Sequence, residues 1–203
     1  MLDLILFLLL MLLVVLLFIL IEVGNITNKF KQAEKFAGGK GTRTKPFLIN
    51  SQGQLHRMRE HLDKHFRLID DVNLKNYCEL RGFSGGWQPI GSEENKFTGS
   101  FDGRDHTIDN MFIEGSDREF AGLFACTGSE AILQNINLQN VNVKGRSRIA
   151  GLVGKNEGLI RNCKVSGRIE GEEKTGAIAG ENKGKVEDCQ QDVIINFYKK
   201  DQC

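Results

Sequence analysis

Short segments of alternating apolar and polar residues fill most of this chain, and the segments recur as copies of one unit. Each copy opens with a turn of small and apolar residues. The three openings are Gly122–Phe124, Gly151–Gly154 and Gly176–Gly180. Repetition with a period of roughly 25 to 30 residues is typical of solenoid proteins, in which each repeat forms one coil.

Two segments with apolar residues at alternate positions follow each opening. In the first segment, we expect Ile132, Ile160 and Val186 to share one register. In the second, the apolar positions are Leu138, Val141 and Val143, then Val165 and Ile169, then Val193 and Ile195. A period of two predicts β-strands with every second side chain pointing inward. We therefore predict an all-β domain over residues 44–203, a right-handed parallel β-helix with two or three short strands per coil.

An unbroken apolar run covers residues 4–21 near the other end of the chain. As an α-helix, with a rise of ~1.5 Å per residue, it would cross a hydrocarbon core of ~30 Å, so we predict a membrane-spanning segment. A cleaved secretory signal is the alternative, but no basic residue precedes the run and no small-x-small cleavage site follows it. The predicted apolar helix occupies residues 1–37, and residues 38–43 form a glycine-rich linker.

A short helix is predicted at the start of the β-helix. Ser51 is a suitable N-cap, and Leu55, Met58, Leu62 and Phe66 have the three-to-four spacing of one buried helix face. A helix here would cover the first coil, whose exposed strand edges would otherwise pair with another chain. No comparable cap follows residue 198, so the last coil is a candidate site of self-association.

Composition excludes several classes of partner. The chain has 203 residues, with 27 basic and 26 acidic ones, and this charge balance argues against nucleic acid as a ligand. Its five cysteines lack the paired C-x-x-C spacing of zinc ribbons and haem attachment. We expect no cofactor and no metal.

Three groups of residues are candidates for chemistry, and each also has a structural interpretation. His61 and His65 have metal-ligand spacing on the predicted helix, but we favour exposed histidines. Asp102 and Asp105 could serve an enzyme that acts on polysaccharides, but aspartates in a turn usually accept backbone hydrogen bonds. Trp87 could stack on a sugar, but we favour a buried tryptophan that fills a coil corner.

The repeats resemble the GLUG motif of β-solenoid regions in microbial surface proteins. The matching residues are Gly151–Gly154, Asn156, Gly158, Ile160, Asn162, Cys163, Val165, Ser166 and Gly167. This resemblance covers about residues 41–198 and implies a fold more than a function. Together with the apolar run over residues 4–21, it favours a membrane-anchored, non-catalytic cell-surface solenoid for adhesion, presentation or assembly, with a carbohydrate or protein ligand. The alternatives are a pilin-like filament subunit and a surface carbohydrate-active enzyme.

Two signals disagree about which side of a membrane the solenoid occupies. The six basic residues between positions 29 and 45 would remain in the cytoplasm by the positive-inside tendency. The resemblance instead implies an extracytoplasmic solenoid. Removal of a basic leader, as in pilin-like subunits, would resolve the conflict, because the apolar helix would then pack in a filament core.

Two covalent modifications are predicted for an extracytoplasmic domain. Cys163 and Cys189 occupy equivalent positions on adjacent coils, ~4.8 Å apart, within the ~4.4–6.8 Å Cα separation that a disulfide requires. In a reducing compartment they would be ordinary core residues. Asn25 opens an N-x-T sequon that could carry a glycan.

Overall fold

The computed structural model describes the backbone of residues 2–33, 35–75, 77 and 85–198, and within the first helix the side chains of residues 7 and 9–24. The chain divides into two compact units, Met1–Lys35 and Phe36–Cys203. We describe each unit by itself.

The first unit consists of helix α1, Leu2–Ala33. Its long leucine-rich run favours a helix because leucine, which is not branched at Cβ, loses little rotamer freedom there. The described apolar side chains of α1 are all exposed, from 49% at Leu16 to 65% at Leu20. Among the residues that the structure describes, however, no helix combines the length and apolarity needed to cross a membrane. The predicted membrane span over residues 4–21 is therefore not confirmed.

The second unit begins with Phe36, whose ring stacks on Phe47 at a centroid distance of 4.3 Å. Strand β1, Phe47–Ile49, follows, and then α2, Gln52–Arg57, with the 3-10 helix η1, Met58–Glu60. Ser51 is the N-cap residue of α2, as predicted, but its side chain makes no capping hydrogen bond.

The predicted capping helix is shorter than its apolar spacing indicated. Leu55 and Met58 are fully buried in the core, but the chain leaves the helix after Glu60. Phe66 lies in strand β2, His65–Leu68, and pairs with Phe47 of β1. The helical prediction failed here because the alternation of buried and half-buried residues over 65–68 competes with the three-to-four spacing.

The remaining strands before the regular repeats are β3, Val72–Asn73, β4, Ser100–Asp102, β5, Thr107–Asp109, and β6, Phe112–Ile113. Three regular coils follow in the described part of the chain, and each has four strands rather than the predicted two or three. The first coil contains β7 (Glu119–Ala121), β8 (Phe124–Cys126), β9 (Ile132–Gln134) and β10 (Asn137–Lys144). The second contains β11 (Ser147–Ala150), β12 (Val153–Asn156), β13 (Leu159–Arg161) and β14 (Lys164–Gly171). The third contains β15 (Glu173–Gly176), β16 (Ala179–Asn182), β17 (Lys185–Glu187) and β18 (Gln190–Phe197).

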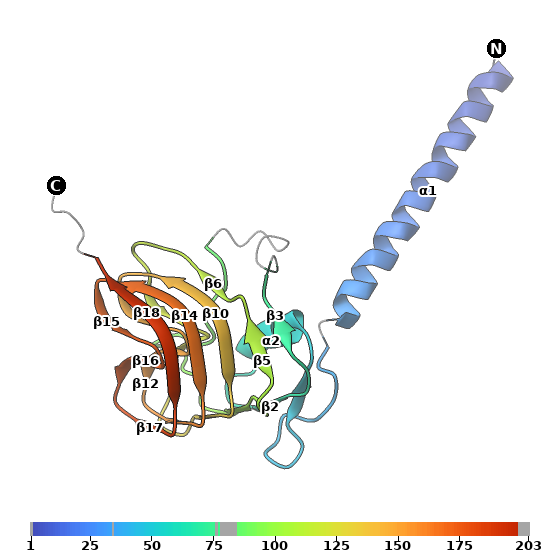
Figure 1. Cartoon of the computed structure of the whole chain (residues 1–203). Helices are drawn as coiled ribbons and strands as arrows, with labels where there is room; N and C mark the ends of the chain where they lie inside the picture. The colour runs from blue at the N-terminus through green and yellow to red at the C-terminus, as the bar shows by residue number, and fades with distance from the viewer. Residues whose placement is uncertain (1, 34, 76, 78–84, 199–203) are drawn as a thin grey trace. The chain divides into compact units, whose positions relative to one another are not determined.

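Equivalent strands of successive coils stack into sheets, and all pairings between named strands are parallel, as the sequence predicted. One sheet has the order β1-β2-β4-β9-β13-β17, and another has the order β18-β14-β10-β5-β3 with β6 beside β10. Two smaller sheets are β15-β11-β7 and β16-β12-β8. In Figure 1 the long strands β10, β14 and β18 lie side by side along one wall of the solenoid.

Register in the shorter strands differs by one residue from the sequence prediction. Ile160 pairs with Leu133, not with Ile132, on one side and with Val186 on the other. Ile132 pairs with Leu159. A one-residue shift matters because it exchanges the inward and outward faces of a strand. Leu133 and Ile160 are accordingly fully buried, whereas Val186 on the last coil is 40% exposed.

Left-handed backbone conformations turn the chain at the same place in each coil. Asn135, Asn162 and Asp188 have φ values of 53°, 51° and 50°. Asn and Asp enter this region more readily than other non-glycine residues. The polar residue before each long strand therefore has a local backbone role.

Candidate functional site

The outer surface of β6, β10, β14 and β18 is the best candidate for a binding site, and we call it the lateral face. Parallel register brings one outward residue from each strand into a single row. Phe112 pairs with Asn142, Asn142 with Arg168, and Arg168 with Ile194. Phe112 and Ile194 are 41% and 59% exposed. An amide and a guanidinium group thus lie between two exposed apolar side chains.

A hollow of about 640 Å³ lies over this row, and we call it the apolar-rimmed hollow. Besides the four residues of the row, charged side chains line it, namely Glu114, Lys144 and Glu170. Lys144 Nζ lies 3.9 Å from Glu170 Oε2 and 5.6 Å from the centroid of the Tyr198 ring. These contacts hold the lysine at one side of the hollow.

A second hollow, of about 280 Å³, lies on the same sheet toward the beginnings of the long strands. We call it the amide hollow because primary amides and a serine dominate its lining. Its polar lining residues are Asn137, Gln139, Ser166, Gln190, Gln191, Lys164 and Asp192.

A β-bulge separates the two hollows. The pairing of β10 with β14 shifts between Leu138 and Val141, and Asn140, within that shift, has a φ of 50°. Opposite it, Gly167 has a φ of 134°, and a Cβ atom there would lie 2.3 Å from the carbonyl oxygen of Val141. Glycine is therefore required at this position, and bulges of this kind bend a strand and redirect its side chains.

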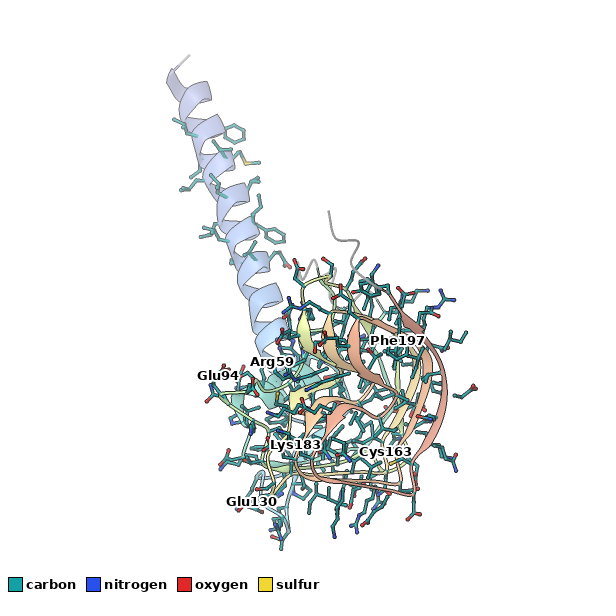
Figure 2. The ribbon with its side chains drawn as sticks, turned by 90° about the vertical axis from the view of Figure 1, so that its left-hand side faces the viewer. Arg59, Glu94, Glu130, Cys163, Lys183 and Phe197 are labelled. Atoms are coloured by element: carbon teal, nitrogen blue, oxygen red, sulfur yellow. The ribbon has the colours of Figure 1, made fainter. Side chains whose placement is uncertain are left out.

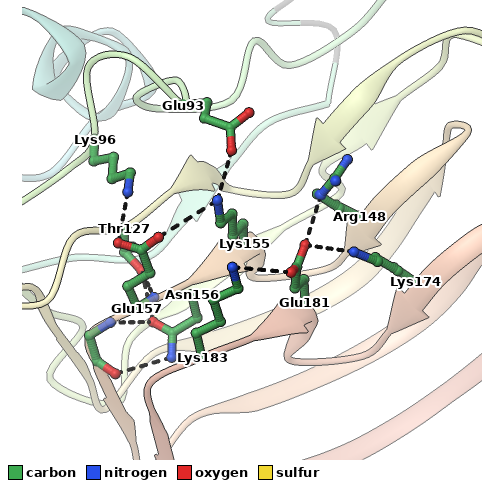
Figure 3. Close-up of polar contacts among 11 residues, drawn as sticks. Glu93, Lys96, Thr127, Arg148, Lys155, Asn156, Glu157, Lys174, Glu181 and Lys183 are labelled. Carbon is green, nitrogen blue, oxygen red and sulfur yellow. Dashed lines mark hydrogen bonds and ion pairs between the residues drawn. The ribbon is translucent and has the colours of Figure 1, made fainter.

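A network of ion pairs occupies a different wall of the solenoid (Figure 3). Lys155 Nζ donates to Glu93 Oε1 at 2.7 Å, and Lys96 Nζ donates to Glu157 Oε2 at 2.7 Å. Hydrogen bonds to these lysines hold the pKa values of Glu93 and Glu157 below their usual range. The hydrogen bond to Glu93 in turn raises the pKa of Lys155.

Glu181 is the centre of the neighbouring ion pairs. Arg148 Nε donates to Glu181 Oε2 at 2.8 Å, and Lys174 Nζ donates to the same oxygen at 3.1 Å. The hydrogen bonds from Arg148 and Lys174 lower the pKa of Glu181 to about 2. Because these charged groups are already paired with one another, we assign the network to stabilisation of the stacked coils.

Cys163 and Cys189 occupy equivalent positions immediately before β14 and β18, as predicted, and the Gln190 backbone N–H donates to the Cys163 carbonyl at 2.9 Å. Both are free thiols in this structure. A hydrogen bond between the two thiols and burial raise the pKa of Cys163 well above its usual range, and the same hydrogen bond lowers that of Cys189 to about 7. The disulfide remains a prediction. In Figure 2, Cys163 and Phe197 lie toward opposite ends of the long strands.

The histidines do not form the predicted exposed helix face. His65 lies in β2, where its Nδ1 atom is 2.8 Å from Ser100 Oγ, and His61 lies after η1 with its ring near Phe36 and Phe47. Burial lowers the pKa of His65. Within the described residues, no three His, Cys, Asp or Glu side chains gather to hold a metal ion.

Asp102 and Trp87 have the structural roles that we favoured. Asp102 Oδ1 accepts hydrogen bonds from the Arg104 backbone N–H at 3.1 Å and from Asn135 Nδ2 at 2.9 Å. Asp105 lies in the same turn with a φ of 62°. Trp87 is fully buried, and its Nε1 donates to the Leu123 carbonyl at 3.2 Å.

The predicted glycosylation site is not tested, because the side chain of Asn25 lies outside the described residues. Sequence reasoning left the binding face open between a lateral strand face and the turns, and it did not identify the residues of the lateral face. Its residues stand at outward positions of strands, where polar and apolar side chains alike are compatible with the fold. An exposed Phe112 or Ile194 at such a position was the available signal.

Comparison with known proteins supports this description. The sequence profile of the GLUG motif matches residues 145–170, which include β11, β12, β13 and most of β14. The chain is 36% identical over 135 residues to a protein of Evansella cellulosilytica named "Putative Gly-rich membrane protein". It is 32% identical over 138 residues to the halomucin of Haloquadratum walsbyi.

These matches include 64% and 66% of this chain but only 15% and 2% of the two relatives. The chain thus spans a small part of their length. A crystal structure described as a "putative immunoglobulin A1 protease" from Bacteroides ovatus superposes with a TM-score of 0.62, over 78% of this chain and 50% of that one. At 22% sequence identity, this likeness concerns the fold alone. Stacked parallel coils and the matched motif together identify the chain as a GLUG-repeat β-solenoid protein.

Proposed function

We propose that this chain is a non-catalytic cell-surface protein whose solenoid presents the lateral face to a carbohydrate or protein ligand, and whose helix α1 associates with the membrane. The observation that carries the proposal is the lateral face itself. Two exposed apolar side chains and two hollows there have no structural role in the solenoid core.

The surface location is supported by the names of the relatives. One is called a membrane protein, and the other is called a halomucin. Both names are consistent with a protein of the cell envelope or the cell surface.

Membrane association is supported by the side chains of α1. Leu13, Phe18 and Leu20 are each 65% exposed, and the other described apolar residues of this helix are exposed as well. Contact with lipid would remove this apolar area from water, at ~25 cal/mol per Å². A second copy of the helix is the competing occupant, and it would produce filaments.

A non-catalytic role is supported by the positions of the carboxylates. Asp102 accepts hydrogen bonds within and beside its turn, and Glu181 forms ion pairs with three cationic side chains. In the apolar-rimmed hollow, Glu170 lies near Lys144. General acid catalysis would need a carboxyl group that stays protonated near neutral pH, whereas the hydrogen bonds from Arg148 and Lys174 lower the pKa of Glu181.

Liposome flotation tests the membrane association. The full chain and a variant with Leu13→Asp and Leu17→Asp would be mixed with vesicles of phosphatidylcholine and phosphatidylglycerol. We expect the wild type to float and the variant to remain at the bottom of the gradient, because charged side chains are costly in hydrocarbon. A matched Leu13→Ala, Leu17→Ala variant should still float. Lipid-free fibres of the wild type would contradict membrane association and favour the filament.

Retention on coated surfaces tests the role of the lateral face. Vesicles that carry the full chain would be applied to surfaces coated with a neutral polysaccharide, an anionic polysaccharide or a mucin glycoprotein. We expect retention on at least one surface, and loss of that retention in Arg168→Ala. Arg161→Ala is the matched control, because this arginine is also exposed on the same coil but belongs to a different sheet. Equal effects of the two substitutions would contradict a binding role for the lateral face.

A further inference from the structure

Both hollows lie on one continuous sheet surface that crosses several coils. The row from Phe112 to Ile194 spans four strands, or about 14 Å at ~4.8 Å per strand. The amide hollow continues this surface along the strands on the other side of the bulge. An extended polymer would fit such a surface better than a small compact molecule, because the site is an open, elongated wall and not an enclosed cavity.

The polar groups of the surface favour hydroxyl groups as partners. A primary amide offers two donors and an acceptor, and a hydroxyl group is both donor and acceptor. Asn142, Asn137 and Gln190 can therefore each bond a hydroxyl in either sense. Because each amide can both donate and accept hydrogen bonds, these amides suit a ligand that repeats the same hydroxyl pattern along its length.

Charge on the lateral face is balanced within each hollow. Lys144 and Arg168 in the apolar-rimmed hollow are matched by Glu114 and Glu170, and Lys164 in the amide hollow is matched by Asp192. A polyanion is bound mainly through an excess of positive charge, which this surface lacks. The charge balance therefore disfavours acidic polysaccharides and nucleic acids.

The exposed apolar side chains of the lateral face favour contact with sugar rings. Phe112 is an exposed aromatic ring at one end of the row, next to Asn142. The C–H face of a sugar ring can cover such a ring while its hydroxyl groups bond to neighbouring amides. Ile194 provides a second apolar contact at the far end of the row.

We infer that the lateral face binds a neutral, extended polysaccharide, which contacts Phe112 and Ile194 through its sugar rings and the amides through its hydroxyl groups. This inference rests on the proposed function, because it names the ligand class of the same face. It excludes acidic polysaccharides as the preferred ligand.

Affinity electrophoresis of the full chain in mild detergent tests the inference. The probes are hydroxyethyl cellulose, laminarin and galactomannan as neutral polymers, with polygalacturonate as the acidic one. We expect retardation by at least one neutral probe, a loss of affinity of at least tenfold in Phe112→Ala, and little change in affinity with salt. Val186→Ala, which truncates an apolar residue of similar exposure on another sheet, should bind like the wild type. Circular dichroism would establish that each variant is folded.

Other outcomes separate the two proposals. Phe112-dependent retardation by polygalacturonate alone, or Phe112-dependent retention on mucin alone, would overturn the neutral polysaccharide and leave the proposed binding face intact. Binding to no probe, together with vesicle retention that does not depend on Arg168, would overturn both.

Discussion

The hydroxyl group of Thr127 donates a hydrogen bond of 2.7 Å to the side-chain carbonyl of Asn156 on the next coil. Asn156 is fully buried, and its Nδ2 donates in turn to Asn182 Oδ1 on the third coil at 2.8 Å. Its Oδ1 also accepts from the Gly158 backbone N–H at 3.1 Å. Figure 3 shows this amide between the stacked strands. One polar column thus joins the three regular coils from the inside.

This column predicts a large loss of stability in Asn156→Leu. The substitution would leave the Thr127 O–H and the Gly158 N–H, both buried, without their acceptor, at about 1–3 kcal/mol for each donor. We expect the free energy of unfolding to fall by about 2–4 kcal/mol, measured by urea denaturation. Asn182→Leu is the control. Asn182 is exposed on the last coil, so its substitution should lower the free energy of unfolding much less. Equal losses in the two variants would show that burial of the amide is not the cause.

Removal of the Glu181 charge should destabilise the solenoid in a pH-dependent way. Its pKa falls from 4.5 to about 2, so the ionised form is favoured in the folded state. The resulting stability is present above pH 4.5 and is lost as the pH falls through about 2. We expect Glu181→Gln to cost about 1 kcal/mol near pH 7 and almost nothing below pH 2, by thermal unfolding at a series of pH values. Glu187→Gln, an exposed glutamate on β17, should show no such dependence.

Trp87 should contribute strongly to the stability of the folded core. Truncation in Trp87→Ala would remove a fully buried ring and the hydrogen bond to Leu123, at a cost of about 3–5 kcal/mol. Trp87→Phe retains most of the ring and should cost less. Unfolding would be followed by circular dichroism, because Trp87 is the single tryptophan of the chain. If Trp87→Ala lowered the free energy of unfolding no more than the surface substitution Ile194→Ala does, the assigned core role of Trp87 would be contradicted.

Oxidised glutathione should join Cys163 to Cys189. The Cys189 thiolate, favoured by its pKa of about 7, attacks one glutathione sulfur and releases one glutathione thiolate. The Cys163 thiol then loses its proton and attacks the Cys189 sulfur, which releases the second glutathione. Burial of the Cys163 thiol, which raises its pKa, makes this second step the slower one. We expect a gain in stability of about 3 kcal/mol after oxidation, measured by thermal unfolding.

Thiol titration checks this prediction. In a background with Cys78→Ser and Cys203→Ser, oxidation should remove two thiols and leave that of Cys126, which is buried and has a pKa raised to about 11. The Cys189→Ser variant should retain its thiols and gain no stability. Persistent reactivity of both cysteines after oxidation would refute the bridge.

The sequence alone determined the kind of fold. Alternation with period two, repeated at a fixed interval, encodes strands that each need a neighbouring coil to cover their inner face, and the parallel pairing of Val165 with Leu138 is the expected result. It also predicted a buried Trp87 and the matched positions of Cys163 and Cys189. These properties follow from local patterns and from the length of the repeat.

Only the tertiary structure decided which outward residues become neighbours. Phe112 and Ile194 are distant in sequence, and they share a row because the register of three successive strand pairs aligns them. Outward positions carry no hydrophobic constraint that would reveal this register, and a shift of one residue at Ile132 was enough to misplace a whole strand face. The sequence likewise carried no sign of the left-handed backbone at Phe120 within β7 and Arg148 within β11, because these residue types rarely adopt that conformation. The local sequence of each strand thus determines which side chains point inward or outward, whereas pairing between coils determines which outward side chains form the lateral face.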